Sequence, residues 1–369
     1  MIAIFYGNSL ISNYLININK QQNNLFYFFF KKKNKKNKKK LKVGVIGLRH
    51  ETNIGNNLLK YAISIKLKEL GFIPYIIGTH YNNTDINFLK NNTNCVVIKK
   101  NFKEIKRNEY DILMVNSDQT WNKIDENYLD YGFLKFAVNW NIPKFVYAAS
   151  LGYDYWIFTK KDEKIAKFLL KKFTGISLRE KGSIKLVEEH LGIHPSFMLD
   201  PTLLIDKKYY LNLIQNYKSN FNINKDYILT YLVISEHNTK QFIKKACNKF
   251  KYKHYKVTMN DKNSIEKFLY GISHCKAVIT NSFHGTIFSI IFHKPFISFI
   301  FKMSPKERLY SLKHLFKLEN RIIEYNEKPD INLLKIPLNI SDSLMKLLKN
   351  KSINFLKKNL GISHKNKII

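Results

Sequence analysis

His284 is the side chain in this sequence best suited to move a proton, and it lies in a polar segment, 281–286, between two apolar runs. An imidazole titrates near neutral pH, so it can hold or deliver a proton. Ser282, Gly285 and Thr286 surround it at the predicted start of a helix, where hydroxyls and backbone N–H groups bind anions. Asn281 precedes them. A capped helix that holds a structural histidine explains the same residues, and for this loop alone both interpretations stay open.

A second polar cluster directly follows the apolar run 110–115. Hydrogen-bonding groups that gather just past a buried strand indicate a site loop, although an Asx turn before a helix has a similar composition. We favour the site, because several kinds of polar side chain and one tryptophan occur together. The candidate substrate contacts in this cluster are Ser117, Gln119 and Trp121, and Asp118 is a candidate catalytic residue.

Arg179 and Glu180 follow a third apolar run, 175–178. A guanidinium at that place can bind a carboxylate or a phosphate through two parallel hydrogen bonds. The loop after residue 47 has neither GxGxxG nor P-loop spacing, so it predicts no nucleotide fingerprint. Further candidates for substrate binding lie after other predicted strands or on a later helix: Asn53, Gly55, Asn56, Ser150 and Arg308.

Strand and helix patterns alternate along the chain and must position these residues. Strands are predicted at 42–47, 72–77, 96–98, 110–115, 144–150, 175–178, 196–199, 227–234, 255–259, 277–280 and 295–301. Helices are predicted at 58–70, 162–173, 183–190, 240–250, 264–273, 304–317 and 341–356, and a further apolar helix follows His284. The alternation predicts an α/β fold with two Rossmann-like, doubly wound parallel-sheet domains that face a cleft.

These patterns divide the chain into four parts. Residues 1–40 form a low-complexity basic tail that we predict to be disordered; a weak tether to anionic lipid is the functional alternative. The apolar run of this tail is too short for a transmembrane helix, and it is a poor secretory signal. Residues 41–206 form the N-terminal domain and 207–340 the C-terminal domain. Residues 341–369 form a final helix and a basic tail, and we expect the helix to pack back on the first domain.

The formal net charge of +34 comes largely from lysines dispersed among Asn, Ile and Phe. Biased coding explains it, and attraction to acidic substrates or to an anionic membrane surface is the functional alternative. Nucleic acid is not an expected partner, because no zinc-ligand pattern, basic zipper or aromatic RNA-binding signature occurs. Three widely spaced cysteines predict no disulfide framework, which favours a cytoplasmic protein.

The motifs that are missing also narrow the chemistry. The sequence has no HExxH, GxSxG, DxD-like pair or Cys/His ligand spacing, which argues against a metalloenzyme or a serine hydrolase. We therefore expect no metal. Arginine, histidine, asparagine and serine groups fit a small dianion with a proton to move, and both phosphoenolpyruvate-like donors and sugar nucleotides meet that description.

Five segments, taken in order, resemble the polysaccharide pyruvyl transferase family. They are NIGNNLLKYAIS at 53–64, DILMVNSDQTWN at 111–122, VYAASLG at 146–152, the stretch from ISLREKGSIKLV to LDPTLLI at 176–205, and AVITNSFHGTIFSIIFHKPF at 277–296. The later RLYSLKHLFKLENRII, at 308–323, is similar to the closing segment of the family. The resemblance implies a GT-B-like fold, in agreement with the two domains read from the pattern.

The resemblance further implies transfer of a pyruvyl group from phosphoenolpyruvate to a sugar of a cell-surface polysaccharide, with formation of a ketal. It also implies that no metal and no organic cofactor are needed. His284 matches the active-site histidine of the family, and it becomes the candidate acid or the group that binds the donor phosphate. Arg179 matches the family's arginine, which is expected to bind the donor carboxylate or phosphate. Asp118 is a candidate to accept the proton of the attacking hydroxyl. Trp121 is either a platform for a sugar ring or a structural tryptophan.

One motif departs from the family. Many members read Arg-Leu-His where this chain reads Ser282-Phe283-His284. The donor phosphate then lacks one expected positive charge, which Arg308 or a nearby lysine can replace; otherwise the donor differs.

Two other classes of function remain open. One is a GT-B glycosyltransferase that uses a nucleotide sugar, and the other is a catalytically silent protein of polysaccharide biosynthesis. For the enzyme, the expected partners are phosphoenolpyruvate and a saccharide acceptor, which can be lipid-linked. In that case we expect the protein to associate weakly with the inner face of the membrane. The residues select no particular acceptor sugar, linkage or oligomeric state.

Overall fold

The computed structural model describes residues 40–47, 53–78, 83–93, 96–99, 101–123, 126–217, 225–234, 236–301, 305–324 and 326–362. The predicted basic tail lies outside these ranges except for Lys40, and so do residues 363–369. No helix within these ranges has the length and apolarity that crossing a bilayer requires.

The first sheet has seven strands: β1 (Lys42–Ile46), β2 (Ile73–Gly78), β3 (Val96–Lys99), β4 (Ile112–Val115), β5 (Lys144–Ala149), β6 (Gly175–Leu178) and β7 (Ser196–Phe197). Their order is β3-β2-β1-β4-β5-β6-β7, and every pair is parallel. Strands β2 and β3 follow β1 toward one edge of the sheet, and β5, β6 and β7 follow β4 toward the other, so the strand order reverses between β1 and β4. Open α/β sheets bind ligands at such a switch point, beyond the carboxyl ends of the strands.

The second sheet has five strands: β8 (Tyr227–Tyr231), β9 (Lys253–Val257), β10 (Ala277–Thr280), β11 (Phe296–Ile300) and β12 (Ile322–Glu324). Their order is β12-β11-β10-β8-β9, again with parallel pairs throughout. The switch point lies between β8 and β10, so the loop after β10 stands at the expected position of a site.

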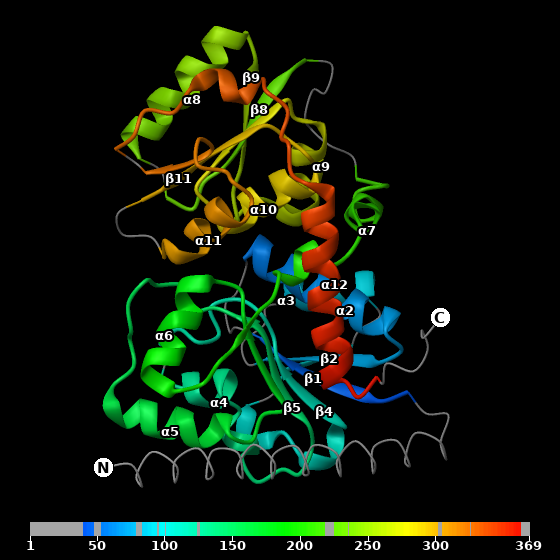
Figure 1. Cartoon of the computed structure of the whole chain (residues 1–369). Helices are drawn as coiled ribbons and strands as arrows, with labels where there is room; N and C mark the ends of the chain where they lie inside the picture. Colours follow the sequence, from blue (N-terminus) through cyan, green and yellow to red (C-terminus); the bar gives the residue numbers. More distant parts are fainter. Residues whose placement is uncertain are drawn as a thin grey trace, which may run out of the picture.

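Helices connect these strands and cover both sheets: α2 (Ile54–Glu69), α3 (Asn83–Thr93), α4 (Tyr128–Gly132), α5 (Lys160–Leu170), α6 (Lys181–Leu191), α7 (Lys207–Asn212), α8 (His237–Phe250), α9 (Ser264–His274), α10 (Phe283–Ile291), α11 (Glu307–Leu315) and α12 (Asp342–Asn359). The two α/β domains predicted from the sequence are confirmed, and Figure 1 shows one above the other.

The strands are apolar on both faces because each sheet is covered on both sides. On β4, Met114 points into the core cluster that contains α2, whereas Val115 points into the cluster formed with α5 and α6. On β10, Val278 faces α9 and α10, and Ile279 faces α8. This arrangement keeps the strands rigid up to the residues where the polar loops begin.

The two domains share one continuous apolar core. Tyr210 of α7 is fully buried and lies between Tyr61 of α2, at a ring distance of 6.1 Å, and Phe288 of α10, at 4.9 Å. These three rings belong to the same buried cluster. The contact brings the start of α2 and the start of α10 to the boundary between the domains.

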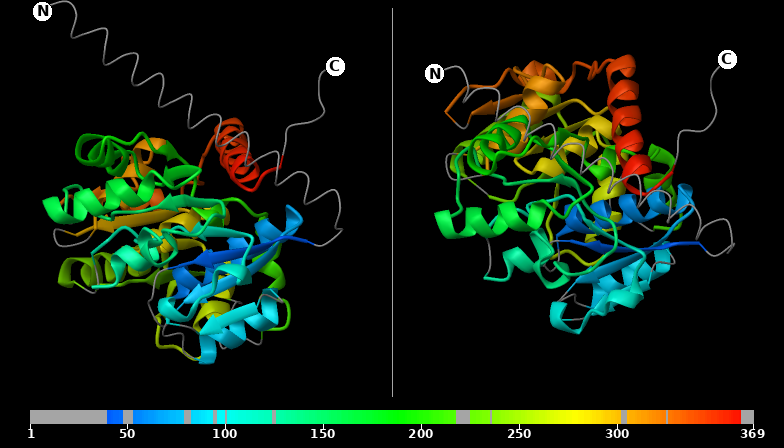
Figure 2. Two further views of the ribbon diagram at one scale, coloured as in Figure 1. Left: turned by 90° about the horizontal axis from the view of Figure 1, so that it is seen from below. Right: turned by 60° about the horizontal axis from the view of Figure 1, so that its bottom comes forward.

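Helix α12 packs back on the first domain, as predicted. The Ser352 hydroxyl accepts a hydrogen bond from the backbone N–H of Leu199 at 3.0 Å, and the Thr174 hydroxyl donates to the Asn359 side chain at 2.9 Å. The ring of Phe355 lies 6.4 Å from that of Phe145 on β5. In Figure 1 this helix runs along the side of both domains, and Figure 2 shows it from two further directions.

The start of α2 corrects the sequence prediction, which placed it at 58. The helix begins at Ile54, because the Asn53 side chain accepts a hydrogen bond from the Asn56 N–H at 3.1 Å and caps it. The polar residues of the first turn masked the apolar periodicity there. Gly55 and Asn56 therefore lie on a helix, and this turn reaches the domain boundary.

Candidate active site

The polar residues that follow four strands meet where the two domains touch. Asp118 follows β4, Arg179 follows β6 and Asp200 follows β7, all in the first domain. His284 follows β10 and lies in the first turn of α10 in the second domain. Hydrogen bonds and close contacts join these four residues into one buried group.

Arg179 stands at the centre of this group with 1% of its side chain exposed. Its Nε donates to Glu180 at 3.0 Å, its Nη1 to Asp200 at 2.7 Å and its Nη2 to Asp118 at 3.1 Å. Nη1 also lies 3.3 Å from the Ser117 hydroxyl. A buried cation among three carboxylates is stable only because each charge is paired, so Arg179 holds this part of the fold together.

Asp118 sits on a sharp bend, with a φ of 93° that few residues other than glycine adopt. Its carboxylate accepts hydrogen bonds from Arg179, from the Asn56 side chain at 2.8 Å and from the backbone N–H of Gln119. Burial alone would raise the pKa of Asp118, but Arg179 and then His284 and Arg308 hold it well below its ordinary value. The carboxylate is consequently ionised and a weak base.

Glu180 has the opposite character within the same group. Its side chain is 1% exposed, and burial raises its pKa despite the neighbouring guanidinium of Arg179. Its second carboxylate oxygen accepts from the Ser183 hydroxyl at 3.1 Å. Two carboxylates on one arginine thus have pKa values shifted in opposite directions, which is common where protons are handled.

His284 is 6% exposed and rests directly on the first turn of α2. A Cβ added to Gly55 would lie 2.0 Å from Nδ1 of His284, so only glycine leaves room for the ring. Nε2 is 3.9 Å from a carboxylate oxygen of Asp200 and has no hydrogen-bond partner among the described residues. Burial lowers the pKa of His284, although Asp200 and Asp118 oppose that effect. The free protein therefore holds a neutral imidazole at neutral pH.

Phe283 places a second arginine beside the first. The guanidinium carbons of Arg179 and Arg308 lie 4.4 Å and 5.6 Å from the centre of its ring, within the range of cation–π contact. Burial and the charge of Arg179 lower the pKa of Arg308 to about 10, so it stays a cation at neutral pH. Its Nε is buried and has no partner among the described residues.

Some polar atoms of these residues and of the nearby loops have no partner among the described residues. Besides Nε2 of His284 and Nε of Arg308, they include Oδ1 of Asn56 and both polar atoms of the Asn116 side chain, as far as the structure is described. Buried polar atoms are nearly always paired in proteins, so each such group calls for an explanation. A bound anionic or hydroxylated ligand would supply partners to most of them.

Several predicted contacts instead hold the loops. Asn281 binds the backbone at Val233 and Ile234 through both ends of its amide, which also explains why β8 ends earlier than predicted. Ser282 caps α10, and Thr286 is buried with its hydroxyl near Ser298 at 2.8 Å. Gly285 has the Thr280 side chain 2.3 Å from where a Cβ would stand. Asn53 caps α2 as described above. These roles match the structural alternative for the loop, with His284 as the exception.

Other predicted contacts lie around the bend at Asp118. Ser117 touches Arg179, and Ser150 donates its backbone N–H to the Asp118 carbonyl at 2.9 Å. The Gln119 side chain lies against Gly152, where a Cβ would meet it at 2.1 Å. All of them shape the loop that carries Asp118.

Trp121 does not offer a platform for a sugar in this structure. Its ring is fully buried, stacks on Phe133 at 4.9 Å and donates its N–H to the Gly132 carbonyl at 2.7 Å. The structural alternative for this tryptophan is therefore the correct one, because a buried ring has no free face for a ligand.

Three residues of the site were missing from the sequence prediction: Asp200, Phe283 and Glu307. Asp200 ends a predicted strand, and that position alone could have indicated it. Phe283 looked like an ordinary apolar residue at a helix start. Glu307 precedes Arg308 on α11, and nothing in the local pattern distinguishes it from an exposed glutamate.

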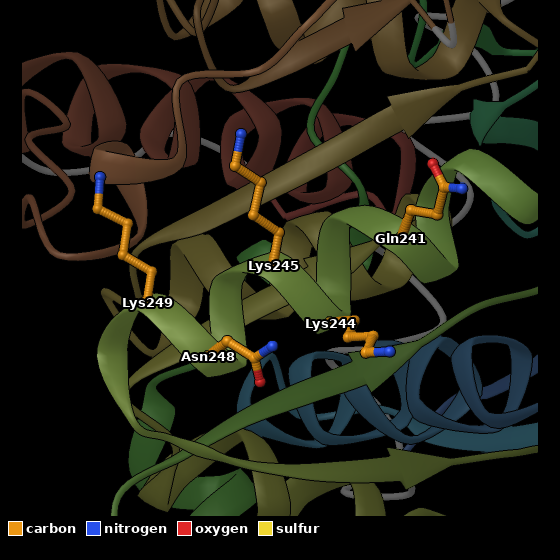
Figure 3. A pocket seen from close by; sticks show the side chains of 5 residues that line it. All are labelled: Gln241, Lys244, Lys245, Asn248 and Lys249. Carbon is orange, nitrogen blue, oxygen red and sulfur yellow. The ribbon is translucent and has the colours of Figure 1, made fainter.

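A separate hollow lies on the outer side of α8, away from this boundary (Figure 3). Its lining consists of Gln241, Lys244, Lys245, Asn248 and Lys249. None of the strand-end residues contributes to it. No group of three or more His, Cys, Asp or Glu side chains suited to a metal ion occurs within the described ranges.

Replacing Gly55 with alanine is expected to displace His284, because the new Cβ would lie 2.0 Å from Nδ1. Overpacking of this kind typically costs about 1–3 kcal/mol. Urea unfolding should show that loss, whereas Gly47→Ala should cost little, since its Cβ would meet nothing closer than 3.5 Å. Equal stability of Gly55→Ala and the wild type would mean that the ring does not rest on α2.

Solved structures with the same architecture confirm the GT-B-like fold. S. aureus MnaA in its structure with UDP is 12% identical, covers 89% of this chain and 99% of its own, and has a TM-score of 0.55. Arabidopsis thaliana UGT89C1 complexed with UDP-L-rhamnose is 9% identical, with coverages of 88% and 100% and a TM-score of 0.55. Comparison with curated protein sequences gives no significant match.

Fold and site together define a two-domain α/β protein of the GT-B type with an arginine and histidine centre between its domains. The profile of the family described as polysaccharide pyruvyl transferase matches residues 53–301, which include every residue of that centre except Glu307 and Arg308. The chain belongs to this family, and it is a transferase.

Proposed function

We propose that this protein transfers the pyruvyl group of phosphoenolpyruvate to a sugar of a cell-surface polysaccharide and forms a cyclic ketal. One observation carries the proposal: the unpartnered Nε2 of His284 and Nε of Arg308 occur together at the boundary between the domains. An imidazole beside a cation suits a donor that brings negative charge and must receive a proton. Membership of the pyruvyl transferase family supports this reading.

Arg308 is the residue that we assign to the donor phosphate or carboxylate. It supplies the positive charge that the family's Arg-Leu-His motif would provide and that Ser282-Phe283-His284 lacks. Arg179 is less suited to that task, since each of its three nitrogens already donates to a carboxylate. We therefore assign Arg179 the role of fixing the carboxylates around it, in place of the donor contact predicted from the sequence.

His284 is the proposed acid. It is neutral in the free protein, and the negative charge of the donor would raise its pKa and favour the imidazolium. Its proton then passes to the methylene carbon of the enol phosphate, which leaves an oxocarbenium-like centre at the adjacent carbon. A sugar hydroxyl forms a C–O bond to this centre and the C–O bond to phosphate breaks. A second hydroxyl then closes the ketal and returns its proton to His284.

The proton of the attacking hydroxyl needs an acceptor. Asp118 was the candidate from sequence, but a carboxylate whose pKa is held well below its ordinary value accepts a proton poorly. The departing phosphate is a stronger base and can take the proton itself. The proposed reaction uses no metal and no organic cofactor. It takes place in the cytoplasm, and the acceptor sugar can be lipid-linked.

Phosphate release from phosphoenolpyruvate tests the proposal directly. Purified protein should release phosphate only when a suitable nucleotide-linked or lipid-linked sugar is present, and the product should carry one pyruvyl ketal. Phosphoenolpyruvate alone should raise the melting temperature through binding to the folded state. Stabilisation by UDP without any effect of phosphoenolpyruvate would overturn the proposal in favour of a nucleotide-sugar glycosyltransferase, and a response to neither would favour a silent protein.

A further inference from the structure

The first two turns of α11 are tied to the first domain by two hydrogen bonds. The Glu307 carboxylate accepts from the backbone N–H of Gly182 at 2.8 Å, in the first turn of α6. One turn further along α11, the Ser311 hydroxyl donates to the carbonyl of Arg179 at 3.4 Å. Helix α11 belongs to the second domain and α6 to the first, and Figure 1 shows them facing each other across the boundary.

The contact at Gly182 leaves no room for a Cβ unless the Glu307 side chain moves. A Cβ at this position would lie 2.4 Å from a carboxylate oxygen of Glu307. A helix N-terminus also favours a carboxylate, because its backbone N–H groups lack partners within the helix and carry partial positive charge. The contact between Glu307 and the start of α6 therefore fixes the position and direction of the first turn of α11 relative to the first domain.

Arg308 is the next residue along that turn, and its position follows from that of Glu307. Its guanidinium lies against Phe283 and 5.6 Å from the ring centre, on the same ring that contacts Arg179. Arg308 and Glu307 share the first turn of α11, so the contact at Gly182 fixes the backbone that carries Arg308. Release of Glu307 from Gly182 would free the helix turn that carries this cation.

We propose that Glu307 is a positioning residue: by binding the N-terminus of α6 across the domain boundary, it holds Arg308 where the donor anion binds. This inference rests on the proposed function, because it concerns the affinity for phosphoenolpyruvate. Glu307 touches no reacting atom, so its loss should act mainly on KM for the donor and much less on kcat.

The charges around Glu307 add a pH dependence. Burial, together with Glu180 of the first domain and Asp154 in the loop after β5, raises the pKa of Glu307 to about 7, although the Gly182 N–H opposes this. Tyr310 faces it from the same helix. The closed contact thus binds a proton more tightly than an open one, in which the carboxyl would lie in water. The contact is accordingly most favoured at acidic pH, weakens as the pH rises from the ordinary carboxyl range to about 7, and changes little above that.

Glu307→Gln and Glu307→Ala separate the effect of the hydrogen bond to Gly182 from the effect of the carboxylate charge. The glutamine keeps an oxygen that accepts from Gly182 but carries no charge, and the alanine removes the acceptor. Alanine is expected to raise KM for phosphoenolpyruvate by about tenfold, the size expected for one lost hydrogen bond to a charged group. Glutamine should keep a low KM across the pH range and abolish the rise of KM that the wild type shows as the pH increases toward about 7. Glu189→Gln, an exposed glutamate of α6, is the matched control.

Two measurements decide the matter: steady-state kinetics from about pH 5.5 to 8.5, and hydrogen exchange of the peptide that contains the Gly182 amide. Faster exchange in the alanine variant than in the wild type or the glutamine variant supports the contact. An unchanged KM and pH profile in Glu307→Ala, with active wild type, overturns the inference alone. Absence of transfer by the wild type overturns the proposed function, and in that case unchanged exchange at Gly182 overturns the contact as well.

Discussion

Replacing His284 with asparagine is expected to lower kcat for pyruvyl transfer by about 10²–10⁴-fold, the usual contribution of a general acid. Asparagine fits the space beside Gly55 and retains a polar group near Asp200, so the fold should persist. It cannot deliver a proton to the methylene carbon of the donor. Phosphate release at saturating phosphoenolpyruvate and acceptor measures the effect.

The same variant distinguishes the two roles open to His284. If the imidazole acts as the acid, kcat and kcat/KM should fall together, because the lost interaction exists only in the transition state. If it binds the donor phosphate, KM for phosphoenolpyruvate should rise while kcat changes little. His194→Asn is the control, since that histidine is 85% exposed and pairs with Glu188 on the surface. Full activity of His284→Asn would remove the histidine from the mechanism.

Replacing Arg179 with alanine is expected to lower the free energy of unfolding by about 3–5 kcal/mol, the cost of breaking a buried ion pair by removing one partner. The variant would leave Asp118, Glu180 and Asp200 buried without their common cation. Urea unfolding near pH 7 measures the loss. Arg107→Ala is the matched control, because Arg107 is exposed and makes one hydrogen bond of 3.3 Å to the Asn141 carbonyl.

The pH dependence of this variant gives a second test. In the wild type the pKa of Asp118 is lowered, so this group contributes stability above its ordinary pKa that is lost as the pH falls. Without Arg179, burial raises the pKa of Asp118 and Glu180, and these carboxyls take up protons as the pH falls from neutrality. The deficit relative to the wild type should thus be smaller near pH 5 than near pH 7. An equal loss of unfolding free energy at pH 5 and at pH 7 would show that the buried carboxylates do not cause it.

The stability loss expected for Arg179→Ala also affects the activity that this variant can show. A loss of transfer in Arg179→Ala would combine misfolding with any loss of chemistry, because the guanidinium holds residues from three strand ends. Arg308→Gln is the cleaner probe of donor binding, since Arg308 makes cation–π contact with Phe283 and its Nε lacks a partner within the described residues.

Sequence reasoning reached much of the fold from local patterns. Strand and helix periods placed nearly every element of both sheets, because side chains alternate across a strand and recur each turn of a helix whatever the rest of the chain does. The same logic placed Arg179 and His284 just past the ends of β6 and β10. The first turn of α2 escaped it, since buried asparagines there carry no apolar signal.

The tertiary structure decided which of these residues act together. Arg179 and Asp118 are 61 residues apart, and Glu307 is 125 residues from Gly182, so no local pattern connects them. Sheet order and the contact between domains bring them together. The sequence by itself determined the class of fold, the strand-end positions of the arginine and the histidine, and the resemblance to the family. Burial and hydrogen-bond partners decide whether a polar side chain can face a ligand. His284 can do so, whereas the polar groups of Arg179, Asn281 and Trp121 are bound to neighbouring residues. These contacts exist only once the chain has folded.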